Sequence, residues 1–302
     1  MADVRHHVEI PQMSVRSSIL ERQRLWAVKA GHTPDSRGYL RAIEENLWTP
    51  MSSRTRAAFQ NGSGAELKSK MRALHSSSAL AVNFFDYWSR GDAKPLADAL
   101  GLPSAIAAIE FEAQQPTGLD GNPPNLDLCL TLANDLTIAI ESKFCEWLSR
   151  KSAAKEHFKP KYFPEGQELW SRVGLPQCQR LAEDVRNRSD PYLYLDVPQL
   201  LKHSLGLASQ LQDRFDLYYL YFDCLCREGT AHRSEIERFA ARVGSEIRFK
   251  ALTYQDVFRK LRTTGATADC IDYLEARYFG DDAEPPHAPD RLQRASPASA
   301  GR

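Results

Sequence analysis

The sequence predicts an α/β fold in which a mixed β-sheet is flanked by helices. Three segments, residues 108–115, 125–133 and 136–147, alternate apolar with polar or small residues, which is the period of a half-buried strand. The apolar, aromatic run DLYYLYFDCL (216–225) predicts a buried strand, and helical patterns lie on either side of it. This order of elements is typical of helices packed against one sheet.

The chain before the first strand is predicted to be mainly helical. Ser17 or Ser18 can cap a helix that ends near Gly31, and residues 37–48 predict a second helix. A loop rich in Gly, Asn and Ser follows at 60–66. The pattern then predicts one long helix through 66–91 and a short one through 93–103.

The turn formers Asn134-Asp135 separate the second and third strands and predict a β-hairpin. Farther on, the patterns predict further helices and one more strand: helices at 177–188, 198–211, 234–244 and 254–264, and a strand at 246–254. We divide the chain into a helical extension (1–60), a main domain (61–280) and a tail (281–302). The tail is nearly free of large apolar residues and is predicted to be disordered.

Composition limits the function classes. The chain has 302 residues, 42% of them hydrophobic, which is enough for one sizeable core. It has no apolar run of transmembrane length and no secretory leader pattern, and its six cysteines are scattered as reduced structural thiols are. We therefore expect a cytoplasmic protein without a membrane partner. Its formal net charge of zero lacks the basic excess of many nucleic-acid binders but allows a local basic groove.

One strand-borne motif carries candidate chemistry. An acid-x-lysine pattern occurs three times, but only Glu141-Ser142-Lys143 lies in a predicted strand that follows another acid-bearing strand. Strand alternation places Glu141 and Lys143 on one face. On the preceding strand, Leu126, Leu128, Leu130 and Leu132 should share one face, with Asp127 on the other.

The hairpin turn places Asp127 opposite Glu141 or Ser142. Two carboxylates facing each other across a hairpin repel unless a positive charge lies between them. Mg²⁺ binds through one or two carboxylates together with water and phosphate oxygens, so Asp127 and Glu141 are candidate metal ligands. Lys143 can then orient the attacking water and offset charge in a phosphoryl transition state. The plainer interpretation is a solvent-facing hairpin on which Lys143 neutralises the acids.

Asp127 followed by Glu141-Ser142-Lys143 resembles the core motif of the PD-(D/E)XK nuclease superfamily. The amino-acid sequence of residues 60–260 resembles that of a bacterial family of restriction-endonuclease-like proteins. Leu126 stands where the superfamily name has proline. The resemblance implies a restriction-endonuclease-like αβββαβ core, dependence on Mg²⁺ with Mn²⁺ as a substitute, and DNA as the substrate. It leaves a homodimer open.

Two residues compete as a third catalytic acid. The resemblance favours Glu66, at the start of the predicted long helix, while Glu112 is a strand-borne rival. The Lys-rich segment 151–163 is the best candidate for phosphate contacts. The sequence thus predicts a Mg²⁺-dependent DNA endonuclease, related to restriction or defence. The alternative is a catalytically inactive nucleic-acid-binding or interaction protein of the same fold.

Overall fold

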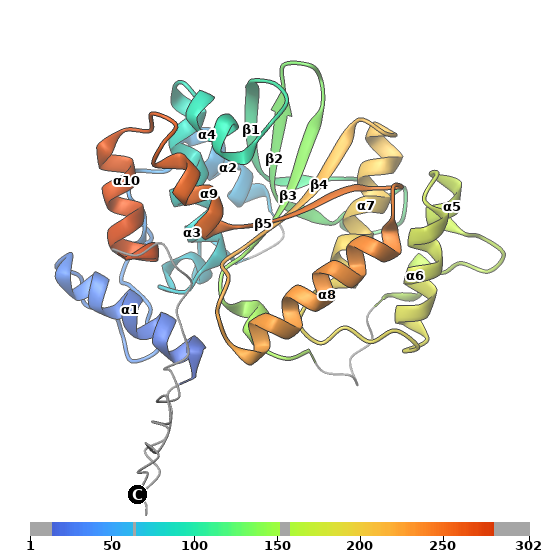
Figure 1. The fold of residues 1–302 in the computed structure, drawn as a ribbon, viewed down its shortest axis with the longest axis horizontal. Helices are drawn as coiled ribbons and strands as arrows, with labels where there is room; N and C mark the ends of the chain where they lie inside the picture. The colour runs from blue at the N-terminus through green and yellow to red at the C-terminus, as the bar shows by residue number, and fades with distance from the viewer. Residues whose placement is uncertain (1–13, 63–64, 152–157, 281–302) are drawn as a thin grey trace, which may run out of the picture.

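The computed structural model describes residues 14–62, 65–151 and 158–280. The predicted fold class is confirmed: one mixed five-stranded sheet, in the order β1-β2-β3-β4-β5, is flanked by helices (Figure 1). The first three strands form an antiparallel meander, and β4 and β5 continue the sheet parallel to β3. The strands are β1 (Ile106–Gln114), β2 (Asn125–Leu132), β3 (Thr137–Lys143), β4 (Phe215–Tyr221) and β5 (Arg248–Thr253).

The predicted hairpin between β2 and β3 is confirmed. Asp135 takes the left-handed conformation, with φ of 62°, which a short Asx-containing turn accommodates. The Leu132 N–H closes the turn by donating to the carbonyl of Leu136 at 2.9 Å. Leu128 pairs with Ile140, and continuing this register places Asp127 opposite Glu141.

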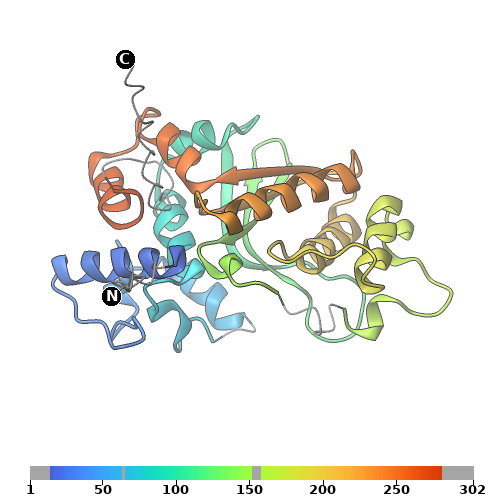
Figure 2. The ribbon, with the colours of Figure 1, turned by 60° about the horizontal axis from the view of Figure 1, so that its bottom comes forward.

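Helices cover both faces of the sheet and produce two hydrophobic cores (Figures 1 and 2). One core joins the sheet to the helices that precede β1 and to the two helices that follow β5. These are α1 (Val15–Lys29), α2 (Ser53–Asn61), α3 (Ser77–Phe85), α4 (Lys94–Leu100), α9 (Tyr254–Leu261) and α10 (Ala268–Leu274). The other core joins it to the remaining helices: α5 (Leu169–Arg172), α6 (Pro176–Arg186), α7 (Val197–Leu211) and α8 (Arg227–Val243).

A buried arginine ties the N-terminal helix to the π-helical turn η6 (Glu275–Phe279). The Arg277 side chain is fully buried, and its guanidinium donates to the carbonyl of Asn46 at 2.7 Å, to the Tyr273 hydroxyl at 2.6 Å and to the Asn46 side-chain oxygen. It also lies 4.2 Å from the centre of the Trp26 ring. From α1, Gln23 donates to the Arg277 carbonyl at 2.7 Å. Residues of the predicted extension therefore share a core with the sheet.

The long helix predicted for residues 66–91 is wrong. The structure has a turn at Glu66, a short 3₁₀ helix (Lys70–Arg72), and α3 only from Ser77. The Ser76 side chain accepts the Ala79 N–H at 3.1 Å, so the run of serines starts a new helix instead of continuing an old one.

Two smaller predictions about the N-terminal region are also wrong. Residues 37–48 form only a 3₁₀ turn at Glu44–Asn46, because Asp35 accepts the N–H groups of Arg37 and Tyr39, both at 2.9 Å, and holds a turn instead. The first helix was correctly predicted, but its cap is Ser14 rather than Ser17 or Ser18.

The leucines of β2 do not all share a face. Leu128, Leu130 and Leu132 pack in the first core, whereas Leu126 packs in the second. The neighbouring strand changes face at the same level, because Glu112 has a positive φ of 49° that interrupts its alternation. The predicted tail, 281–302, lies outside the described residues. Among the helices that the structure describes, none is both long and apolar enough to cross a membrane.

Candidate active site

The structure brings Asp127, Glu141 and Lys143 together at one end of the β2–β3 hairpin. Asp127 accepts a hydrogen bond from the Ser142 backbone N–H at 2.8 Å, so its carboxylate lies against the neighbouring strand. The ammonium group of Lys143 donates to Oε1 of Glu141. Strand alternation is the cause, because residues two apart on β3 project from the same face.

The three side chains lie at different depths. Glu141 is 1% exposed and Lys143 is 15% exposed, while Asp127 is partly exposed. Solvent or a substrate therefore reaches Asp127 and Lys143 first, with Glu141 at the floor of the site. A buried carboxylate is expensive unless it is paired, so this depth gives the charges near Glu141 unusual weight.

Burial and mutual repulsion separate the proton affinities of the two acids. Burial, followed by the charge of Glu141, raises the pKa of Asp127 well above its usual value. Burial alone would also raise the pKa of Glu141, but Lys143 and His203 lower it to about 2. Although burial lowers the pKa of Lys143, the two carboxylates raise it well above its usual value. Lys143 is therefore an ammonium cation at neutral pH.

Glu112 continues the row of acids onto β1. Phe111 pairs with Leu128 and Ala113 with Leu126, so Glu112 lies opposite Asp127. Burial raises the pKa of Glu112, and the charges of Glu66 and Glu141 add to the effect. Glu112 also has a positive φ of 49°, which is uncommon for a non-glycine residue within a strand.

Glu66, the other candidate third acid, is anchored outside the sheet. It lies in a turn, so the expected position on a helix is corrected. Lys70 donates to one of its carboxylate oxygens at 3.0 Å, and the Ser78 hydroxyl donates to the other at 2.8 Å. Its charge acts on Glu112 but is not among the main influences on Asp127 or Glu141.

Sequence reasoning missed His203. This residue lies on α7, and its Nε2 is 3.0 Å from Oε2 of Glu141, with both side chains 1% exposed. The available signal was a histidine within the apolar helical run PQLLKHSLGLASQL. Only the packing of α7 over the sheet identifies its partner, because nothing in the local sequence does.

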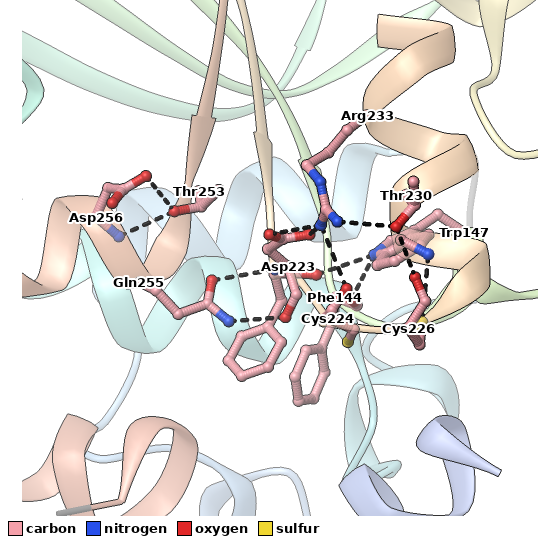
Figure 3. Close-up of polar contacts among 12 residues, drawn as sticks. Phe144, Trp147, Asp223, Cys224, Cys226, Thr230, Arg233, Thr253, Gln255 and Asp256 are labelled. Carbon is pink, nitrogen blue, oxygen red and sulfur yellow. Dashed lines mark hydrogen bonds and ion pairs between the residues drawn. The ribbon is translucent and has the colours of Figure 1, made fainter. Parts of the chain in front are cut away.

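A hydrogen-bonded clamp holds the strand ends next to the site (Figure 3). Trp147 donates from its indole nitrogen to the carbonyls of Phe144 at 3.0 Å and Phe222 at 3.1 Å, which joins the chain after β3 to the chain after β4. Gln255 accepts the N–H of Asp223 at 3.0 Å and donates to its carbonyl at 2.9 Å. These bonds fix the end of the sheet from which Lys143 projects.

The acids fit a hard divalent cation in type, since Mg²⁺ prefers carboxylate oxygens. Oε2 of Glu141 is buried 3.0 Å from Nε2 of His203 and makes no well-aligned hydrogen bond among the described residues. The side chains do not form a ready-made cage, however. Within residues 14–62, 65–151 and 158–280, no group of three or more His, Cys, Asp or Glu side chains is arranged to hold a metal ion.

The predicted phosphate-contact segment is only partly visible, because 152–157 lie outside the described residues. At its start, Lys151 pairs with Asp196 at 2.6 Å, and farther along Lys161 donates to the carbonyl of Asp120. These contacts engage two of its cations within the protein.

Comparison with protein families gives a match over residues 14–279 to the family described as "Restriction Endonuclease associating with ARP". The comparisons with curated proteins and with solved structures found no match. The matched segment includes the whole sheet, the hairpin acids and α7. The chain therefore belongs to this restriction-endonuclease-associated family.

Proposed function

We propose that the protein is a Mg²⁺-dependent endonuclease of the PD-(D/E)XK type that hydrolyses phosphodiester bonds in DNA, in restriction or defence. One observation carries the proposal: Asp127 and Glu141 face each other across a hairpin, and Lys143 from the same strand contacts Glu141. Membership of a restriction-endonuclease-associated family supports a nuclease role.

Asp127 and Glu141 would hold the cation, with Mn²⁺ able to replace Mg²⁺. Glu112 is the better third acid, because it lies opposite Asp127 and, among the described residues, only one of its oxygens is engaged, by Asn125, whereas both oxygens of Glu66 are bonded. When bound, the metal supplies Lewis acidity to a phosphate oxygen. Lys143, as an ammonium, would move away from Glu141. It would then orient the attacking water and stabilise charge on the phosphoryl oxygens.

A cleavage assay tests the proposal. Supercoiled plasmid, linear duplex, single-stranded DNA, branched DNA and duplex RNA are incubated with the protein in Mg²⁺, Mn²⁺ or EDTA. We expect cleavage of DNA with either metal and none in EDTA. Asp127→Asn, which keeps the shape of the side chain and removes its charge, is expected to abolish cleavage.

The assay also separates the alternative function. A catalytically inactive nucleic-acid-binding protein of the same fold would retard DNA in a gel without cutting any substrate in either metal. That result, obtained with folded protein, would contradict the nuclease proposal.

A further inference from the structure

We propose that His203 is a positioning residue that sets which oxygen of Glu141 is presented to the cation. The inference rests on the proposed function and adds a residue from α7 to a site otherwise built by the sheet. Lys143 contacts Oε1 of Glu141, and His203 lies 3.0 Å from Oε2. The carboxylate is thus bracketed by two nitrogen groups, one from its own strand and one from a helix above it.

Among the described residues, the polar contact recorded for the buried His203 ring is the one with Glu141. Both ring nitrogens are buried without a well-aligned hydrogen bond among the described residues, although Glu141 is within hydrogen-bonding distance. An unsatisfied buried polar group costs about 1–3 kcal/mol, so a histidine that served packing alone would be a poor choice here.

The packing of α7 keeps the imidazole in place. Gly206 lies one turn after His203, and a Cβ on this glycine would come within 2.5 Å of the Gln115 carbonyl, so the helix backbone rests directly against the chain that leaves β1. The imidazole itself is 1% exposed, and Leu201 and Leu207 of the same helix are buried in the second core. The helix that carries the ring is therefore packed firmly over the sheet.

Distance without alignment suggests how the pair works. In the assembled site, the Glu141 carboxylate would turn so that Oε2 accepts a hydrogen bond from Nε2–H of His203 and Oε1 leaves Lys143. Oε1 would then be free for the cation, and Lys143 would be free to act on the water. Catalytic hydrogen bonds are often poorly aligned until the complete site assembles. Mg²⁺ prefers oxygen ligands, so His203 is assigned to orienting Glu141 rather than to the metal itself.

Mn²⁺ affinity measured by calorimetry tests this assignment. His203→Leu and His203→Met remove the donor and keep apolar volume, and either variant carries the test if the other does not fold. Loss of a donor to a metal-binding carboxylate costs about 10–100-fold in metal affinity or activity, and we expect a drop of that size in Mn²⁺ affinity. His203→Gln retains an N–H donor and is expected to restore most of the affinity.

His232→Leu is the matched control, because His232 is also fully buried but donates to or accepts from Tyr219 at 3.0 Å rather than contacting an acid. It should bind Mn²⁺ as the wild type does. Wild-type affinity in folded His203→Leu or His203→Met would overturn the assignment while leaving the metal site intact. If the wild type itself binds no Mn²⁺, the proposed metal site is contradicted, and so is the role assigned to His203.

Discussion

Two regions of the molecule each bury a charged side chain: the π-helical turn η6 buries Arg277, and the β2–β3 hairpin buries Glu141. The two side chains differ in how completely their hydrogen-bonding groups are paired. Arg277 is surrounded by acceptors, which include both oxygens of Asn46 and the Tyr273 hydroxyl. Glu141 has a buried oxygen with no well-aligned donor and lies beside a histidine in the same condition. Both groups are at most 1% exposed, so burial alone does not explain the difference.

Glu235 shows that this chain can satisfy a buried acid when structure alone requires it. Its carboxylate accepts three consecutive backbone N–H groups, those of Leu193, Tyr194 and Leu195, at 2.8–2.9 Å. Incomplete satisfaction is therefore not a general property of the buried acids that the structure describes. An under-satisfied polar group in a native fold requires an explanation, and at the hairpin site we attribute it to function.

Replacing Lys143 tests the hairpin site and should have the largest effect of the three changes, a loss of cleavage rate. Lys143→Ala is expected to slow plasmid cleavage by about 10²–10⁴-fold, because it removes the group that orients water and stabilises transition-state charge. Mn²⁺ binding should survive, since the acids remain, and DNA affinity in a gel shift should fall only slightly. Cleavage at the wild-type rate by the folded variant would remove Lys143 from the mechanism.

Replacing Arg277 tests the buried network at the π-helical turn and should lower folding stability. Arg277→Leu should lower the free energy of unfolding by about 3 kcal/mol or more, because it leaves several buried oxygens without a donor. Urea denaturation measures the loss. Arg54→Leu is the control, since Arg54 is 64% exposed where it pairs with Glu110, and surface changes usually stay within about 0.5 kcal/mol. Equal losses for the two variants would show that the Arg277 network contributes little.

Removing the charge of Asp127 should change the free energy of unfolding less than replacing Arg277 does, and in the opposite direction. The folded-state pKa of Asp127 is raised, so its ionisation opposes folding above that pKa, and the penalty disappears as the pH falls below the unfolded value near 3.8. Asp127→Asn should therefore be more stable than the wild type at neutral pH, by about 1 kcal/mol, and the advantage should shrink in acid. A variant less stable than the wild type at pH 7 would contradict the view that this acid is held at a cost.

Local patterns predicted the sheet well. Each of the five strands follows from alternation or from an apolar run. The Asn134-Asp135 turn predicted Asp127 to lie opposite Glu141 or Ser142, and the observed strand register selects Glu141. The failures have physical causes. A helical spacing of apolar residues does not reveal that Ser76 starts a new helix. A serine can lie within a helix or use its hydroxyl to accept a backbone N–H at a helix start, and the spacing is the same in both cases.

Features that depend on distant contacts could not be predicted. The positive φ of Glu112 is unusual for glutamate, and only the paired strands show that β1 and β2 change face together. His203 reaches Glu141 through the packing of α7 over the sheet, where Gly206 allows the helix to lie close to the chain after β1. Neither fact has a local signature in the residues concerned.

The two nitrogen partners of Glu141 differ in when they become available during synthesis. Lys143 is on the same strand, whereas His203 is on a helix that leaves the ribosome much later. Short loops close faster and at lower entropic cost than long ones, so the hairpin can neutralise its deepest acid before α7 exists. A hairpin that forms before α7 is synthesised would therefore already pair Glu141 with Lys143, whereas His203 can contact Glu141 only after α7 has packed over the sheet.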